Sequence, residues 1–153
     1  MSPRIFKEKK RRLITVNDLI EELEKCKHYV VITGEPGAGK TTLARYLVYK
    51  LSERALKKVS SFNSIFYIRL RDCKSIWDYI TNKYDVEYKK LKDRCSKYLF
   101  IFNGFDEVDS KSKNKIIEEI KSLQASKVVT SRVFTTHPKL TKSMRLPSLT
   151  TQR

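Results

Sequence analysis

One glycine-rich segment carries the clearest chemical signal in this sequence. Residues 34–42 match the complete pattern G-x-x-x-x-G-K-[ST]. Glycine allows the backbone to turn tightly and to approach an anion closely, so that successive N–H groups point at a phosphate. The N-terminus of the following helix adds a partial positive charge. The pattern predicts a nucleoside triphosphate site formed by Gly34, Glu35, Pro36, Gly37, Ala38, Gly39, Lys40, Thr41 and Thr42.

A second set of polar residues follows an apolar segment further along the chain. Residues 98–102 are aromatic or aliphatic, and Asn103, Asp106 and Glu107 come shortly after them. A nucleotide hydrolase needs one carboxylate to hold Mg²⁺ beside the phosphates and another to orient the attacking water. The competing interpretation is that Asp106 and Glu107 are acids at the start of a helix in an ordinary loop.

A third polar position follows residues 128–130, which are Val-Val-Thr. Ser131 and Arg132 come next, and an arginine at the end of a strand can contact a γ-phosphate through its fork of N–H groups. Taken alone, such an arginine is more often an ordinary surface residue. Its position directly after an apolar strand favours the phosphate-sensing interpretation.

The apolar pattern predicts the elements that must position these residues. Short apolar segments predict strands at residues 28–33, 64–70, 98–102, 127–131 and 143–146. Helices are expected at residues 17–27 with Asn17 as the cap, and at 40–57, 75–97 and 110–124. Strands that alternate with helices imply a parallel sheet with right-handed crossovers. The expected fold is an α/β P-loop NTPase three-layer sandwich, with a mostly parallel sheet of about five strands flanked by helices.

The composition limits the number of domains and the class of protein. A chain of 153 residues with 40% hydrophobic residues is long enough for one domain. We expect residues 1–13 to form a basic disordered arm and residues 14–153 to form the P-loop NTPase core. The three widely spaced cysteines favour reduced thiols in the cytoplasm over disulfides or a zinc site. No apolar run is long enough to cross a membrane, so we expect no membrane association.

The formal net charge of +16 is the one unusual feature of the composition. Residues 1–12 carry six basic side chains and one acidic one, and residues 110–153 carry ten basic and two acidic ones. Such a surface attracts polyanions, including nucleic acid. The competing interpretation is a solvated, lysine-rich surface. Tyrosine and phenylalanine do not visibly alternate with the basic residues, as a base-stacking platform would require. Nucleic-acid binding therefore stays open.

Taken in this order, the three motifs resemble those of the NACHT group of STAND ATPases, the signal-transduction switches of innate immunity and programmed cell death. That group has a glycine phosphate loop, an Asp-Gly-x-Asp-Glu segment after an apolar strand, and a Thr-Ser-Arg at the end of the next strand. Residues 103–107 and 130–132 correspond to the second and third of these motifs. The resemblance covers about residues 14–150. The glycine between the strand and the acidic pair separates this group from general AAA+ proteins.

The resemblance implies a role for each matching residue. Lys40 would contact the β- and γ-phosphates, and Thr41 would bind Mg²⁺. Asp106 and Glu107 would position the water for hydrolysis, Asp106 also facing the metal, and Arg132 would sense the γ-phosphate. The implied ligands are ATP or ADP and Mg²⁺. The family also implies partner proteins or self-association.

Two departures from the family pattern bear on function. The magnesium-facing aspartate of the family falls at Asn103, which has an acceptor oxygen but no negative charge, so metal binding and hydrolysis should suffer. STAND proteins also continue into a winged helix and sensor repeats, and the resemblance here covers the core portion alone. An excised domain, a truncated gene product and a small stand-alone relative all agree with this pattern.

The expected function is an ATP- and ADP-binding, NACHT-like switch domain of the signalling and innate-defence type, with weak or absent ATP hydrolysis. Three alternatives stay open. The first is a nucleic-acid-dependent ATPase or loader that uses the basic surface. The second is a small-molecule or nucleoside kinase, although the sequence shows the signature of neither an acceptor pocket nor a lid arginine cluster. The third is a structural remnant that no longer switches.

Overall fold

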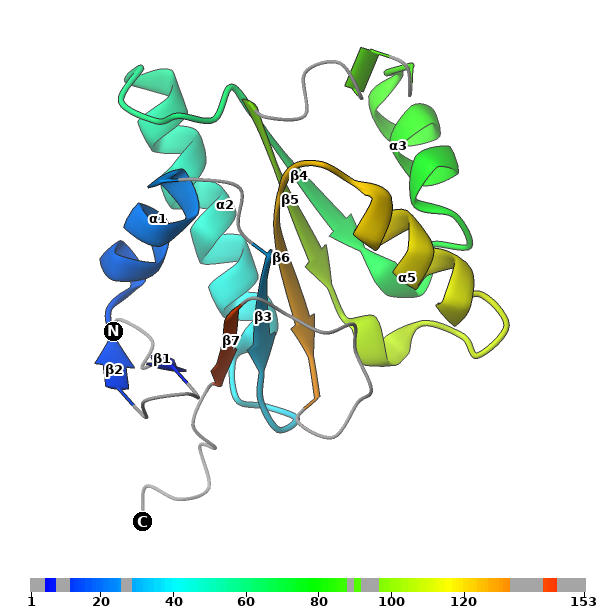
Figure 1. The fold of residues 1–153 in the computed structure, drawn as a ribbon, viewed down its shortest axis with the longest axis horizontal. Helices are drawn as coiled ribbons and strands as arrows, with labels where there is room; N and C mark the ends of the chain where they lie inside the picture. Colours follow the sequence, from blue (N-terminus) through cyan, green and yellow to red (C-terminus); the bar gives the residue numbers. More distant parts are fainter. Residues whose placement is uncertain are drawn as a thin grey trace.

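A seven-stranded sheet runs through the centre of the computed structural model, in the order β2-β1-β7-β3-β6-β5-β4 (Figure 1). The structure describes residues 5–7, 12–25, 29–87, 90–91, 97–132 and 142–145. Five neighbouring strands are parallel, namely β7 (Lys142–Arg145), β3 (Tyr29–Thr33), β6 (Ser126–Ser131), β5 (Tyr98–Asn103) and β4 (Ser64–Arg69). The predicted parallel sheet of about five strands is confirmed.

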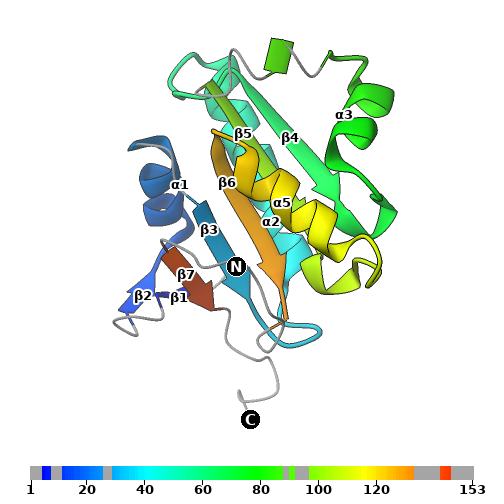
Figure 2. The ribbon, with the colours of Figure 1, turned by 45° about the vertical axis from the view of Figure 1, so that its right-hand side comes forward.

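Helices cover both faces of this sheet, as Figures 1 and 2 show. Helices α1 (Val16–Lys25) and α2 (Lys40–Leu56) pack on one face, and α3 (Ile76–Tyr84) and α5 (Lys113–Ser122) pack on the other. Successive strand residues point to opposite faces. In β5, Ile101 therefore joins the core under α1 and α2, while Phe100 joins the core under α3 and α5. The three-layer sandwich is confirmed. None of the helices in the described ranges is long and apolar enough to cross a membrane.

Helix α1 begins at a different cap from the one that the sequence predicts. The hydroxyl of Thr15 accepts a hydrogen bond from the Asp18 N–H at 3.1 Å, and the Asp18 carboxylate accepts one from the Thr15 N–H at 2.9 Å. This reciprocal pair is a capping box, which satisfies two N–H groups that the helix itself leaves unpaired. The prediction of Asn17 as the cap is wrong, because Asn17 already lies inside the first turn.

Two segments differ from the predicted arrangement. Within residues 1–13, for which we predict a disordered arm, the structure places β1 (Ile5–Lys7) and the start of β2 (Arg12–Ile14). Strand β1 pairs antiparallel with both β2 and β7, because the edge of a sheet offers unpaired N–H and C=O groups whatever the charge of the side chains. The helix predicted at 75–97 ends at Tyr84, where Asp85 adopts a left-handed conformation. Of residues 86–97, those at 88–89 and 92–96 lie outside the described ranges.

A carboxylate from α5 holds the N-terminus of α3. Glu119 Oε1 accepts a hydrogen bond from the Ser75 hydroxyl at 2.8 Å, and Glu119 Oε2 accepts one from the Ile76 N–H at 2.7 Å. The negative charge also lies at the positive end of the helix dipole. This contact joins the two helices that cover the same face of the sheet.

We expect Glu119→Gln to lower the free energy of unfolding by about 1–2 kcal/mol, because the amide keeps the shape but loses the charge and one acceptor. Urea unfolding followed by circular dichroism measures this change. Glu118→Gln is the matched control, since Glu118 is exposed and pairs only loosely with Lys121 at 3.9 Å. Equal effects of the two substitutions would contradict the capping role.

Candidate nucleotide-binding site

The three polar motifs meet at one edge of the sheet. Strands β3, β6 and β5 are neighbours and parallel, so their carboxyl ends lie side by side. The glycine loop follows β3, Asn103 ends β5, and Arg132 follows β6. Ligands of open α/β sheets bind outside the carboxyl ends of the strands. The topology therefore brings together residues that are far apart in the sequence.

A cavity of about 410 Å³ lies at this edge. Its lining contains the predicted loop residues 36, 37 and 39–42, together with Asn103, Asp106, Glu107 and Arg132. Three other predicted loop residues lie outside the lining, namely Gly34, Glu35 and Ala38. Thr130 and Gly104 line the cavity although the sequence did not single them out as site residues. The lining thus contains side chains from all three motifs.

The glycine loop has the backbone conformation that an anion cradle requires. Gly37 and Gly39 have φ angles of 82° and 97°, in the left-handed region that other residues rarely adopt. Gly39 directly precedes α2, and no side chain of the described residues caps that helix. The first N–H groups of α2 are therefore available to a ligand, at the end of the helix that attracts anions.

The ammonium group of Lys40 lies over the loop. Lys40 Nζ donates hydrogen bonds to the carbonyl oxygens of Gly34 at 2.6 Å and Glu35 at 3.1 Å. Burial lowers the pKa of Lys40, and the carboxylate of Asp106 partly opposes that shift. A phosphate oxygen would be a stronger acceptor than a neutral carbonyl, because charge-assisted hydrogen bonds are about twice as strong as neutral ones. Lys40 is thus placed to transfer its hydrogen bonds to a phosphate.

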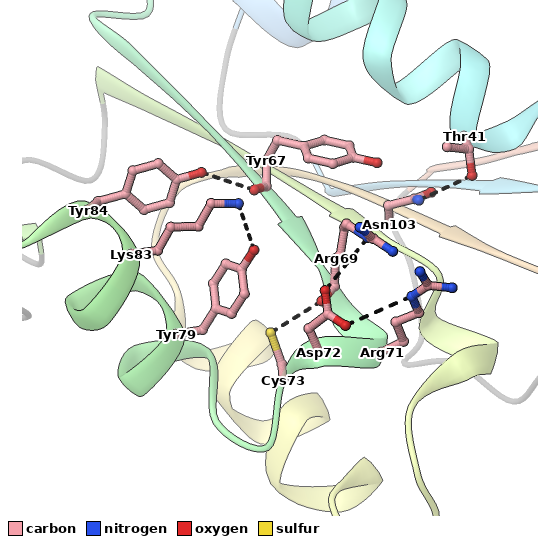
Figure 3. Close-up of polar contacts among 10 residues, drawn as sticks. All are labelled: Thr41, Tyr67, Arg69, Arg71, Asp72, Cys73, Tyr79, Lys83, Tyr84 and Asn103. Carbon is pink, nitrogen blue, oxygen red and sulfur yellow. Dashed lines mark hydrogen bonds and ion pairs between the residues drawn. The ribbon is translucent and has the colours of Figure 1, made fainter.

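A chain of hydrogen bonds orients the amide of Asn103. The Gly104 N–H donates to Thr130 Oγ1 at 2.9 Å, and the Thr130 hydroxyl donates to Asn103 Oδ1 at 2.6 Å. Asn103 Nδ2 then donates to Thr41 Oγ1 at 3.2 Å, a contact that Figure 3 shows. Thr130 is fully buried, so both of its hydrogen bonds stabilise this orientation. Its signal in the sequence was the threonine of the Thr-Ser-Arg segment.

This orientation bears on the predicted magnesium ligands. Mg²⁺ requires oxygen ligands. Asn103 directs its N–H group at Thr41, and its oxygen is occupied by Thr130. Thr41 and Asp106 do offer oxygens to the cavity, and among the described residues no cluster of three or more His, Cys, Asp or Glu side chains could hold a metal. Thr41 and Asp106 thus remain the oxygen donors for Mg²⁺, with both carboxylate oxygens of Asp106 also in contact with Arg132, and Asn103 does not fit as oriented here.

A positive charge lies beside the same amide. Arg69 of β4 is the register partner of Asn103, and cross-strand partners project from the same face of a sheet. Figure 3 shows the two side chains next to each other, with the Arg69 guanidinium directed toward Asp72 at 3.7 Å. Arg69 was not among the predicted site residues. Its charge is partly neutralised by the ion pair with Asp72.

A buried thiol lies next to this segment. Cys73 is buried and donates a weak hydrogen bond to the Arg69 carbonyl oxygen at 3.5 Å. Burial raises the pKa of the Cys73 thiol to about 12, so it stays protonated at neutral pH. Cys73 is a free thiol, as predicted, and Cys26 and Cys95 lie outside the described ranges.

The acidic pair and the arginine meet at the mouth of the cavity. Arg132 Nε lies 3.2 Å from Asp106 Oδ2, and the Arg132 backbone N–H donates to Asp106 Oδ1 at 3.2 Å. The Arg132 side chain is 62% exposed and that of Asp106 is 13% exposed. Gly104 turns the chain between Asn103 and this pair with a φ of 84°, and a Cβ there would come within 3.3 Å of Glu107. The Arg132 guanidinium and the Asp106 carboxylate thus form an ion pair.

Comparisons with known proteins agree with this geometry. The family model described as NACHT domain matches residues 28–149. Among curated proteins, the chain is similar to NLR family CARD domain-containing protein 4 of Xenopus tropicalis (26% identity over 125 residues, 74% of this chain and 12% of that protein). It is also similar to NACHT, LRR and PYD domains-containing protein 5 of Mus musculus (27% identity, 54% of this chain and 8% of that protein).

Two further similarities are to proteins whose names do not mention NACHT or NLR. Dynein heavy chain-like protein 2 of Plasmodium falciparum is 30% identical, over 76% of this chain and 2% of that protein. The solved structure of C. elegans PCH-2 aligns at 18% identity with a TM-score of 0.49, over 87% of this chain and 39% of that one. The chain thus spans 12% or less of the length of the curated relatives that it matches.

Proposed function

This chain belongs to the NACHT domain family of P-loop NTPases, and on that basis we propose that it is an ATP- and ADP-binding switch domain with weak or absent ATP hydrolysis. The observation that supports the proposal best is the contact between Asp106 and Arg132 at the mouth of the phosphate cavity. A switch needs a group whose position depends on which nucleotide is bound. The Arg132 guanidinium is such a group.

The proposed switch works by competition for Arg132. The glycine loop and Lys40 would hold the phosphates that ATP and ADP share. The γ-phosphate of ATP would add a negatively charged acceptor near Arg132, which would then exchange Asp106 for the phosphate. ADP lacks that group, so the pair would stay closed. A ligand shifts a conformational equilibrium only through such a difference in contacts.

The same contacts support slow hydrolysis. Asp106 and Glu107 are the residues proposed to orient the attacking water, and Arg132 holds the first of them. Mg²⁺, when bound, would neutralise phosphate charge, and Thr41 and Asp106 are the residues proposed to hold it. Asn103 adds no negative charge at the position where an aspartate would attract Mg²⁺. We therefore expect the domain to bind ATP and ADP but to hydrolyse ATP slowly or not at all.

The wider role is proposed from the family. Membership in the NACHT family and the similarity to two NLR-type proteins support a signalling function of the innate-defence type. Partner proteins or other copies of the chain would receive the signal, in the cytoplasm. The preference for adenine is likewise proposed from the family.

Isothermal titration calorimetry with ATP and ADP, in Mg²⁺ or in EDTA, tests the proposed function. We expect both nucleotides to bind and the affinity to change little between Mg²⁺ and EDTA. Hydrogen exchange at residues 104–108 should rise with ATP but not with ADP, because only ATP draws Arg132 away from Asp106. Failure of both nucleotides to bind, or identical exchange with the two, would contradict the switch.

A further inference from the structure

The outer side of α2 exposes an unusual group of side chains. Among the described residues, the large hydrophobic side chains that are exposed all lie within residues 46–59, namely Tyr46, Tyr49, Leu56 and Val59. Tyr49 is 62% exposed and therefore points into solvent. Helix α2, cyan in Figures 1 and 2, packs on the sheet through the opposite side. This solvent-facing side does not belong to the nucleotide cavity.

Helical spacing gathers two tyrosines and two cations on this side. Arg45 and Tyr49 are four residues apart, as are Tyr46 and Lys50, and residues four apart are neighbours on a helix surface. The buried residues of the helix take the other side, namely Leu43, Ala44, Leu47 and Leu51. We call Arg45, Tyr46, Tyr49 and Lys50 the α2 patch.

One cation of the α2 patch, Lys50, lies beside its aromatic rings. Lys50 Nζ is 5.7 Å from the ring centre of Tyr46 and 5.8 Å from that of Tyr49. Lys50 also lies 3.9 Å from the Glu53 carboxylate, at the edge of the patch. No carboxylate of the described residues is within ion-pair distance of Arg45. The patch thus offers two tyrosines that are 36% and 62% exposed, together with two cations that can bind phosphate.

We propose that the α2 patch binds single-stranded nucleic acid. Non-specific single-strand sites combine aromatic rings, on which bases stack, with cations that follow the phosphate backbone. Tyr49 and Tyr46 supply the first group, and Arg45 and Lys50 supply the second. The net charge of +16 brings a polyanion to the surface from a distance. The site is separate from the nucleotide cavity, and the inference does not depend on the proposed switch.

An acidic polypeptide is the competing occupant, and the layout of the patch disfavours it. Docking of an amphipathic peptide needs a continuous apolar surface. On α2, Glu53 lies between Tyr49 and Leu56 along the same side of the helix, so the apolar surface is interrupted. Stacking of a base needs only one exposed ring beside a cation, which the patch has.

Fluorescence anisotropy with a labelled oligothymidine of about 20 nucleotides tests the inference on the full chain. We expect binding that weakens as salt rises. Tyr49→Ala should lose about 5- to 150-fold in affinity, because stacking on one base contributes about 1–3 kcal/mol, while Tyr49→Phe should keep it. Arg45→Gln should reduce the slope of log affinity against log salt by about 0.7, the value for one phosphate contact on a single strand.

Lys121→Gln is the matched control, because it removes one charge from an exposed position on α5, far from the patch in the fold. It should bind like the unmodified chain. Circular dichroism checks that each variant is folded. The inference is wrong if the oligonucleotide does not bind, or if Tyr49→Ala and Arg45→Gln bind it as Lys121→Gln does. It is also wrong if polyglutamate binds the chain as tightly as the oligonucleotide does and if Tyr49→Ala lowers both affinities by the same factor. The occupant would then be an acidic polypeptide.

Discussion

Replacing Lys40 with alanine should abolish measurable ATP and ADP binding, with a loss in affinity of at least about 100-fold. Lys40 lines the cavity, and its Nζ makes two hydrogen bonds to the loop carbonyls of Gly34 and Glu35, both of which a phosphate would replace. Hydrogen bonds to charged groups contribute about 1.5–3 kcal/mol each, so two of them account for a loss of this size. Isothermal titration calorimetry with each nucleotide measures the change.

Lys57→Ala provides the control for this substitution. Lys57 follows the same helix at its other end and forms an exposed ion pair with Glu53 at 3.3 Å. Its removal changes the net charge equally and should leave nucleotide affinity unchanged. If Lys40→Ala bound ATP as well as Lys57→Ala does, the cavity at the glycine loop would not be the nucleotide site.

Replacing Asn103 with aspartate should make nucleotide binding depend on Mg²⁺. The carboxylate would accept hydrogen bonds from the Thr130 and Thr41 hydroxyls and would turn a charged oxygen toward the position that the amide N–H now faces. We expect ATP to bind at least about 10-fold more tightly with Mg²⁺ than with EDTA, a difference of about 1.4 kcal/mol. ATP turnover should rise by about the same factor. In EDTA, the added carboxylate should repel the phosphates and weaken binding.

Asn103→Ala is the control for Asn103→Asp, because it removes the amide without adding a carboxylate. It removes the hydrogen bond to Thr41 without adding charge, so its ATP affinity should stay insensitive to Mg²⁺. Malachite green detection of released phosphate measures turnover in all three proteins. An Asn103→Asp variant that binds ATP equally in Mg²⁺ and in EDTA would show that residue 103 does not face the metal.

The sequence alone predicted the five parallel strands, most of the helices and most of the residues that line the cavity, but not β1 and β2. The glycine loop, Asn103, Asp106, Glu107 and Arg132 were all expected near a phosphate, and the structure brings them to one cavity, although their roles remain predictions. These features could be predicted because they are local. A run of apolar residues makes a strand, and three glycines make a loop, wherever the rest of the chain lies. The cap of α1 was predicted wrongly as Asn17, because only the geometry of the first turn shows that the helix begins at Val16 and that Thr15 accepts the capping hydrogen bond.

The tertiary structure alone decided which side chains contact one another. In the sheet, β6 lies between β3 and β5, although it is the last of the three strands along the chain. This order makes possible the hydrogen bonds that link Thr130, Asn103 and Thr41. It also makes possible the ion pair of Arg132 with Asp106. Strand order in the sheet depends on how helices and loops pack across the whole domain. The same packing buries one side of α2 and exposes Tyr49. The local pattern of apolar and polar residues determined where most helices and strands form. Packing between elements far apart in the sequence decided which of their side chains are in contact.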